Sequence, residues 1–423
     1  MPIDPRKPDI AKRFVAAIDA ASIDLKSKRI GLAVSGGGDS IALMHLAARL
    51  LRPENLFVVT VNHNLRPNAA AEIALVSAQA KELGLPHAVL DWHWDKTGNL
   101  QAAARAGRWA TIVKWSLGAS IDAVFLGHTE DDQLETLLMR LARGSGIDGL
   151  TGMARHNARD GLDIYRPLLD VSRADLRAWL TTQKISWCDD PSNDDPRFDR
   201  VRARQMFAQL EALGLTRKRL LQTADHMQAA HGSLQRAAVE FARMHVRQDA
   251  GDLLFARAAM ALDTEDAPRR VMAAALRWMN GKDYKPRFDP MLQAVMTVRA
   301  GRTATFAGCI LSPESGGMRM TREVSATQAA HRYAALIDDI SGVTWDGRWF
   351  LQGPVAPDLS YRALDKGIGQ CPDWRHSGHP RQSLLASPSV WRGKELVSAP
   401  LAGFGNGWTA QIVADFHEHA FAH

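Results

Sequence analysis

RIGLAVSGGGDS, at residues 29–40, joins a short apolar run to three consecutive glycines, and apolar residues at helical spacing follow over 41–51. This order predicts a buried strand, a tight turn and a helix. Consecutive glycines let the backbone bring its N–H groups against phosphate oxygens, and the positive end of the helix dipole lies at the same place. We therefore expect a phosphate-binding loop formed by Ser35, Gly36, Gly37, Gly38, Asp39 and Ser40.

The segments after this loop continue the alternation of strand and helix. Strands are expected at 56–61 (LFVVTV), around 88–90 and at 123–126 (AVFL), and helices at 69–83, 101–115 and 131–141. This alternation predicts an α/β fold, in which an open parallel sheet carries helices on both faces. Such a sheet binds its ligands beyond the carboxyl ends of its strands.

The second half of the chain has a different pattern. Residues 200–246 are expected to be mostly helical and are rich in arginine, whereas the tail beyond about 330 contains more Gly, Pro and Trp and short strand-like runs such as 349–351. The tail is expected to form a small α/β or mostly β module. A chain of 423 residues is long enough for two or three domains.

Composition restricts the class of protein. The net charge of +6 fits a polyanionic partner, although any basic soluble protein has a similar charge. The cysteines Cys188, Cys309 and Cys371 form no CxxC pair, which argues against a disulfide framework, a zinc ribbon or an iron–sulfur cluster. No secretory signal and no run of about 20 apolar residues is present, so a cytoplasmic protein without a membrane span is expected.

The phosphate loop is not a Walker A motif, because no Gly-Lys-[Ser/Thr] follows the glycines. Ser35 and Ser40 supply hydroxyl donors, and Asp39 is a candidate either to hold Mg²⁺ or to orient a bound nucleotide. The loop resembles that of the ATP-pyrophosphatase (PP-loop) superfamily. This resemblance implies cleavage of ATP to AMP and pyrophosphate, with adenylation of an oxygen instead of phosphoryl transfer.

Four further segments narrow the choice within that superfamily: VNHNLR at 61–66, NLQAAARAGRW at 99–109, GHTEDDQLET at 127–136 with RGSG at 143–146, and WCDDPSN at 187–193. Together they resemble the tRNA(Ile)-lysidine synthase family over roughly the first half of the chain. The sequence departs from the family pattern at Gln101, where Glu is common, at Trp109, where Tyr is common, and at Val201, where Asn usually follows the arginine. None of these changes removes a charge that the chemistry requires.

The resemblance implies a two-step reaction on cytidine 34 of an isoleucine tRNA with a CAU anticodon. The C2 carbonyl oxygen first attacks the α-phosphate of ATP and releases pyrophosphate. The ε-amino group of free L-lysine then attacks C2, expels AMP and leaves lysidine. Such an enzyme is a ligase that forms a carbon–nitrogen bond.

Roles for the candidate residues follow from their chemistry and from the resemblance. The phosphates need Mg²⁺ and cationic donors, for which Asp39, Arg105 and Arg108 are the candidates. The resemblance suggests that Asp132 and Glu135 bind lysine, and paired carboxylates suit an ammonium group. Further candidates are assigned to ATP (His63 and His128) and to tRNA (Arg66, Arg197, Arg200 and Arg204).

The expected organisation has three parts: a catalytic PP-loop domain at 1–215, a helical tRNA-binding domain at 216–330 and a C-terminal tRNA-binding module at 331–423. A homodimer is expected only from the resemblance.

Three rival functions remain to be weighed. A tRNA thiolation enzyme usually needs paired or catalytic cysteines, and Cys188 has no partner nearby in sequence. A non-catalytic RNA-binding protein with this fold would be expected to lose the loop or its acids, whereas Asp39, Asp132 and Glu135 are all present. A small-molecule amidotransferase would need a Cys–His nucleophile, and none is apparent.

Overall fold

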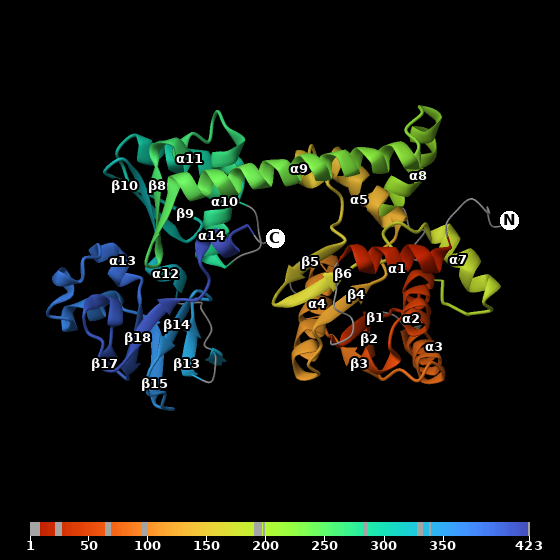
Figure 1. Cartoon of the computed structure of the whole chain (residues 1–423), viewed down its shortest axis with the longest axis horizontal. Helices are drawn as coiled ribbons and strands as arrows, with labels where there is room; N and C mark the ends of the chain where they lie inside the picture. The colour runs from red at the N-terminus through yellow and green to blue at the C-terminus, as the bar shows by residue number, and fades with distance from the viewer. Residues whose placement is uncertain are drawn as a thin grey trace. The chain divides into compact units, whose positions relative to one another are not determined.

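The computed structural model describes residues 9–21, 28–63, 69–94, 100–189, 197, 199–281, 286–327, 333–337 and 340–421. Its contacts divide the chain into two compact units, Met1–His231 and Gly232–His423, and Figure 1 shows the elements of each. The expected three-part division stays a prediction. None of the helices in the described ranges is both long and apolar enough to cross a bilayer.

The first unit is built on one six-stranded sheet with the order β3-β2-β1-β4-β6-β5. Neighbouring strands are parallel except at the edge, where β5 runs antiparallel to β6. The strands are β1 (Ile30–Ala33), β2 (Leu56–Asn62), β3 (His87–Asp91), β4 (Ala123–Leu126), β5 (His156–Arg159) and β6 (Leu162–Tyr165).

Helices cover both faces of this sheet, as its side-chain packing shows. Ala123 and Phe125 of β4 belong to a core with α1, α2 and α7, whereas Val124 between them packs with Ile112 of α4 on the opposite face. The helices are α1 (Ile10–Ala20), α2 (Gly38–Leu50), α3 (Ala69–Glu82), α4 (Leu100–Gly118), α5 (Glu130–Ala142), α6 (Ile147–Leu150), α7 (Arg173–Thr182), α8 (Asp199–Ala212) and α9 (Arg217–His245), which continues into the second unit.

The α/β fold expected from the sequence is therefore confirmed, and each expected strand and helix up to residue 141 is present within a few residues of its expected bounds. The β5–β6 hairpin was not expected. It extends the sheet on the far side of β4, where Asp160 and Gly161, both at positive φ, form the turn between its strands.

The second unit begins with a five-stranded antiparallel sheet of order β7-β8-β11-β10-β9, which packs against α10 and α11. Residues 216–330 thus contain the expected helices together with a sheet that the sequence did not indicate. The elements are β7 (Val246–Asp249), β8 (Asp252–Ala256), α10 (Asp266–Asn280), α11 (Phe288–Arg299), β9 (Ala304–Phe306), β10 (Cys309–Glu314), β11 (Gly317–Arg322) and α12 (Val324–Thr327).

The remainder of the second unit is mostly β, as expected for the tail. One sheet has the order β12-β13-β14-β18 and another the order β15-β16-β17. Their elements are β12 (Tyr333–Ile337), β13 (Ile340–Trp345), β14 (Trp349–Gln352), β15 (Leu359–Ala363), α13 (Arg381–Leu385), β16 (Pro388–Arg392), β17 (Glu395–Ser398), β18 (Thr409–Ile412) and α14 (Phe416–His419).

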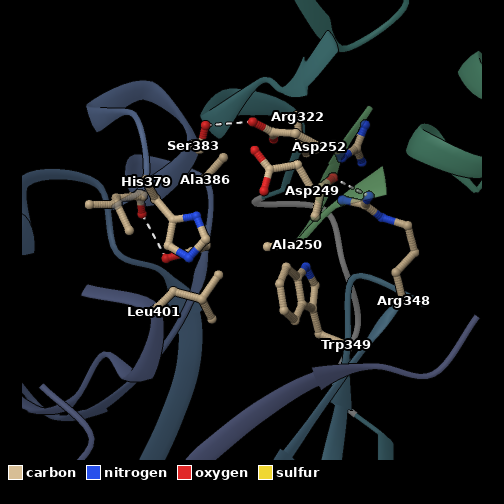
Figure 2. Close-up of a pocket in the computed structure, with 13 residues that line it drawn as sticks. Asp249, Ala250, Asp252, Arg322, Arg348, Trp349, His379, Ser383, Ala386 and Leu401 are labelled. Atoms are coloured by element: carbon tan, nitrogen blue, oxygen red, sulfur yellow. Dashed lines mark hydrogen bonds between the residues drawn. The ribbon is translucent and has the colours of Figure 1, made fainter. Parts of the chain in front are cut away.

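Buried charges connect the two parts of the second unit. Asp252 of β8 accepts hydrogen bonds from Arg319 (2.9 Å) and Thr321 (3.1 Å) of β11 and from Ser383 (2.5 Å) of α13. Figure 2 shows Asp252 and Ser383 beside a pocket that His379 and other residues line. Because a buried carboxylate is stabilised only when it is paired and hydrogen-bonded, these contacts fix α13 against the five-stranded sheet.

Candidate active site

The phosphate loop has the compact geometry that its glycines predict. Gly36 has φ +90°, a conformation that L side chains rarely adopt, and Gly37 caps the start of α2. The Ser40 hydroxyl accepts a hydrogen bond from the Ser35 backbone N–H (3.1 Å) and donates one to the Gly37 carbonyl (2.9 Å). The backbone N–H groups at the start of α2 are thereby held in the position that suits an anion.

The loop lies where the strand order of the sheet changes direction. β1 pairs with β2 on one side and with β4 on the other, so the segments that follow β1 and β4 meet at one sheet edge. A Cβ atom on Gly127, just after β4, would lie 3.1 Å from the Asp39 carbonyl oxygen and 3.2 Å from the Ser40 Cα. Gly127 therefore permits the close approach of the second motif to the phosphate loop.

Asp132 is held by the N-terminus of α5. Its Oδ2 accepts hydrogen bonds from the backbone N–H (2.8 Å) and the hydroxyl (2.9 Å) of Thr129, which completes a capping box. Its Oδ1 faces Arg173 and Arg200. Burial alone would raise the pKa of Asp132, but Arg173 and the Thr129 donors lower it overall. Asp132 is thus an oriented carboxylate that stays ionised.

Glu135 lies one turn further along α5 and is 4% exposed. Its Oε1 accepts hydrogen bonds from Arg204 Nε (3.1 Å) and Nη2 (2.9 Å) on α8. The opposite face of α5 is anchored by Leu134 and Leu137, which pack with Leu220 at the start of α9. The two carboxylates predicted to bind lysine are therefore adjacent, buried and fixed on one helix. We call Asp39, Asp132 and Glu135 the acid cluster.

Arg173, at the first position of α7, contacts all three carboxylates of the acid cluster. It was not among the residues predicted from the sequence. Its Nε donates to Asp39 Oδ2 (3.0 Å), Nη2 to Asp132 Oδ1 (3.4 Å) and Nη1 to Glu135 Oε1 (3.5 Å). Burial raises the pKa of Asp39, an effect that Arg173 opposes without cancelling. Arg173 lies 134 residues from Asp39 in sequence, and its only local signal is a capped helix start after Ser172.

His128 precedes the cap of α5 and is neutral at physiological pH. Burial lowers its pKa to about 4, and the guanidinium groups of Arg166, Arg200 and Arg108 contribute in the same direction, whereas Asp132 opposes them. Its Nδ1 is buried and has no hydrogen-bond partner among the described residues. A neutral imidazole beside this site is able to donate or accept one hydrogen bond to a ligand.

Arg105 and Arg108 lie on α4 with solvent-accessible side chains. The surrounding protein nevertheless removes part of their hydration, which lowers the pKa of both, and Arg200 lowers both further by repulsion. The guanidinium of Arg105 also acts on Arg166, whose pKa burial lowers to about 10. A group of mutually repelling guanidinium ions favours an anionic ligand.

The remaining candidates differ in their surroundings. His63 follows β2 and packs edge-on against Trp92, with ring centroids 5.7 Å apart. Arg197 is exposed, and its carbonyl oxygen accepts a hydrogen bond from Arg202. Arg66 and the segment 190–193 lie outside the described residues. Arg200 and Arg204, predicted to contact tRNA, form ion pairs with Asp132 (3.7 Å) and Glu135 (2.9 Å), and their contact with tRNA stays a prediction.

Cys188 contributes its backbone to the loop. Its N–H donates to the Gly36 carbonyl (3.0 Å), and Gly37 and Cys188 form a parallel bridge. Burial and the nearby carboxylates of Glu72 and Asp189 raise the pKa of the thiol. A nucleophilic or sulfur-transferring cysteine is usually favoured by the opposite shift of its pKa.

A protein-family model and several relatives match this chain. Residues 8–211 match the PP-loop domain family. A tRNA(Ile)-lysidine synthase from Ruegeria pomeroyi is 42% identical over 403 residues, which cover 94% of this chain and 94% of the relative. The tRNA(Ile)-lysidine synthase from Rhodopseudomonas palustris is 49% identical, and the match covers 49% of this chain and 61% of the relative. The tRNA(Ile)-lysidine synthase from Anaplasma marginale is 31% identical, and the match covers 76% of this chain and 70% of the relative. With nearly the full length of one relative matched, the chain belongs to the tRNA(Ile)-lysidine synthase family.

Proposed function

We propose that this chain forms lysidine at cytidine 34 of an isoleucine tRNA with a CAU anticodon, using ATP and free L-lysine. The observation that carries the proposal is the meeting of a phosphate loop with two buried carboxylates on α5 at the point where the strand order changes direction. This arrangement places an anion site beside an ammonium site, as a reaction between ATP, a base and lysine requires.

In the first step the C2 carbonyl oxygen of the cytidine attacks the α-phosphate of ATP, and pyrophosphate leaves. The N–H groups at the start of α2 and the Ser35 and Ser40 hydroxyls would hold the departing phosphates. Arg105 and Arg108 supply the cationic charge that stabilises the transition state. Neutral His128 would donate to a phosphate or base oxygen without adding positive charge.

Magnesium fits this site through Asp39. Among the described residues no group of three or more His, Cys, Asp or Glu side chains forms a protein-only metal site. Mg²⁺ is usually bound by one or two carboxylates together with substrate phosphates, and Asp39 stands in the first turn of α2 beside the loop. When bound, the ion would neutralise phosphate charge.

In the second step the lysine ε-amino group attacks C2 and expels AMP. The ammonium group of lysine needs ionised acceptors that are fixed in place, and Asp132 and Glu135 supply them. The lowered pKa of Asp132 suits binding of the ammonium better than accepting its proton, since a weakly basic carboxylate stays ionised. Before the amine attacks C2, that proton would pass to Glu135, the other carboxylate at the ammonium site.

The tRNA would lie on the arginine-rich part of the site and on the second unit. The Arg200 and Arg204 side chains are 42% and 39% exposed, so each can pair with an acid and still reach a phosphate. We assign Arg66 and Arg197 to the same role. A protein that acts on tRNA in this way would work in the cytoplasm, and size-exclusion chromatography with light scattering would test the expected homodimer.

The test is incorporation of radiolabelled lysine into unmodified tRNA(Ile) with a CAU anticodon, with and without ATP and Mg²⁺. We expect ATP-dependent labelling that is lost when cytidine 34 is replaced by uridine. Absence of labelling with tRNA that is bound would contradict the proposal. Sulfur incorporation that depends on Cys188 would support the thiolation reading instead.

A further inference from the structure

Three arginines contact the three carboxylates of the acid cluster. Arg173 contacts all three of its carboxylates, while Arg200 and Arg204 each pair with one of them. Three acids therefore face three guanidinium groups. A lysine ammonium that enters such a cluster gains little unless one of these cations leaves, because it would add positive charge next to positive charge.

Arg200 has the longest contact, 3.7 Å to Asp132, but Arg173 is the cation placed to move toward the phosphate loop, because it also contacts Asp39 there. Two of its contacts, to Asp132 (3.4 Å) and Glu135 (3.5 Å), are longer than the 2.7–2.9 Å typical of a charge-assisted hydrogen bond. The contact to Asp39, in the first turn after the phosphate loop, is shorter at 3.0 Å. A shift of the guanidinium toward the loop would thus break the two weak contacts and keep the strong one.

The backbone of Arg173 is fixed while its side chain reaches solvent. The Arg173 N–H donates to Asp131 Oδ2 (2.7 Å), and Ser172 caps α7. The side chain is 21% exposed. A long side chain on an anchored Cα atom can turn between two sets of partners, and the planar guanidinium binds carboxylate and phosphate oxygens equally well.

We propose that Arg173 couples the two substrates: in the arrangement described above it occupies the lysine carboxylates, and the phosphates of ATP draw it toward the loop so that Asp132 and Glu135 become available. This inference rests on the proposed function. It makes lysine binding dependent on nucleotide and assigns to Arg173 a positioning role that no motif indicated.

The coupling is reciprocal, since thermodynamic linkage requires each ligand to change the affinity of the other by the same factor. For the unchanged chain we expect α,β-methylene-ATP with Mg²⁺ to tighten lysine binding about 5- to 150-fold, the usual range of coupling between sites. Isothermal titration calorimetry of the full chain would measure lysine with and without the analogue, and the analogue with and without lysine.

The decisive variant is Arg173→Gln, which removes the charge and keeps a polar side chain. It should bind lysine more tightly than the unchanged chain when nucleotide is absent, and the coupling factor should fall to about 1, the value for independent sites. Arg177→Gln is the matched control, because Arg177 lies on the same helix and its guanidinium pairs with the exposed Asp189 (2.7 Å). It should keep the full coupling.

Arg173→Lys provides a second variant should Arg173→Gln fail to fold, as judged by its thermal melting curve. A compact ammonium does not reproduce the spread of a guanidinium whose Nε, Nη1 and Nη2 each reach a different carboxylate. The coupling factor of Arg173→Lys should therefore lie below that of the unchanged chain. Tight lysine binding without coupling in the unchanged chain, or full coupling in both Arg173 variants, would overturn the inference and leave the proposed function standing. Absence of lysine binding in every state would overturn both.

Discussion

The two carboxylate oxygens of Asp132 have different partners. One oxygen stabilises the start of α5, and the other faces the proposed lysine site. Oδ2 is used by the capping box with Thr129, while Oδ1 faces Arg173 and Arg200. Asn at this position retains a carbonyl oxygen for the cap and loses the negative charge toward the ligand. Asp132→Asn should therefore keep the cap of α5 and weaken the binding of an ammonium group.

We expect Asp132→Asn to raise the KM for lysine about 10- to 100-fold, the equivalent of one hydrogen bond to a charged group, and to change the KM for tRNA much less. Initial rates of labelled lysine incorporation at saturating ATP measure both. Asp170→Asn is the control, because the carboxylate of Asp170 pairs with Arg155, which is not one of the arginines that contact the acid cluster. Equal increases in the two KM values would contradict the assignment of lysine binding to Asp132.

A second prediction at the residue scale concerns how the protonation of His128 changes stability with pH. Its pKa is about 4 in the folded chain and 6.5 in the unfolded chain, so between these values the unfolded state binds more protons. The free energy of unfolding therefore does not depend on the protonation of His128 above pH 6.5. It decreases as the pH falls from 6.5 to about 4, and below that His128 causes no further change. The loss amounts to at most about 3 kcal/mol.

An NMR titration of the imidazole signals measures this directly. The signal that disappears in His128→Asn should not shift between pH 7 and pH 5. A midpoint near 6.5 for the His128 signal would show that this ring is not held neutral by burial.

At the scale of elements, the site depends on how closely the segment after β4 approaches the phosphate loop. A Cβ atom at Gly127 would meet backbone atoms of Asp39 and Ser40 at 3.1–3.2 Å. Backbone atoms in a loop that is held by the Ser40 hydrogen bonds cannot yield as a flexible side chain would. This close approach therefore couples the helix that carries Asp132 to the loop that we propose binds phosphate, in addition to the contacts of Arg173.

We expect Gly127→Ala to reduce stability by about 1–3 kcal/mol, the usual cost of overpacking, and to weaken ATP binding because the loop must shift. Thermal unfolding and nucleotide titration measure the two effects. Gly118→Ala is the matched control: a Cβ atom there meets nothing within 4 Å, and its φ is not positive. Unchanged nucleotide affinity in Gly127→Ala would show that the approach does not shape the loop.

The elements of the first unit could be predicted because parallel strands that are buried on both faces are short apolar runs between glycine or proline turns. The strands of the second unit lack this signal. β10 has the sequence CILSPE and ends in polar residues and a proline, so it does not stand out from a loop. The candidate site could be predicted where motifs are local, as on α5, but not where Arg173 joins residues that are distant in sequence, since no local pattern encodes such a contact.

At the scale of the whole molecule, we expect the two units to contribute differently to the binding of ATP, lysine and tRNA. The phosphate loop, the acid cluster and the arginines of α4 and α8 all belong to Met1–His231. Binding of ATP and lysine should therefore need only this unit. tRNA is much larger than either, and its affinity should come mainly from phosphate contacts spread over both units.

A chain that ends at residue 245, the last residue of α9, tests this division. It keeps Leu220 and Ala224, which pack against α5. We expect calorimetric titration to give unchanged affinities for lysine and α,β-methylene-ATP. Its affinity for tRNA should fall, and the slope of log K against log salt should become shallower by about 0.7–0.9 for each phosphate contact that is lost. The full-length chain measured at the same salt concentrations is the reference. An unchanged salt slope would place the tRNA contacts in the first unit alone, and the second unit would then need another role.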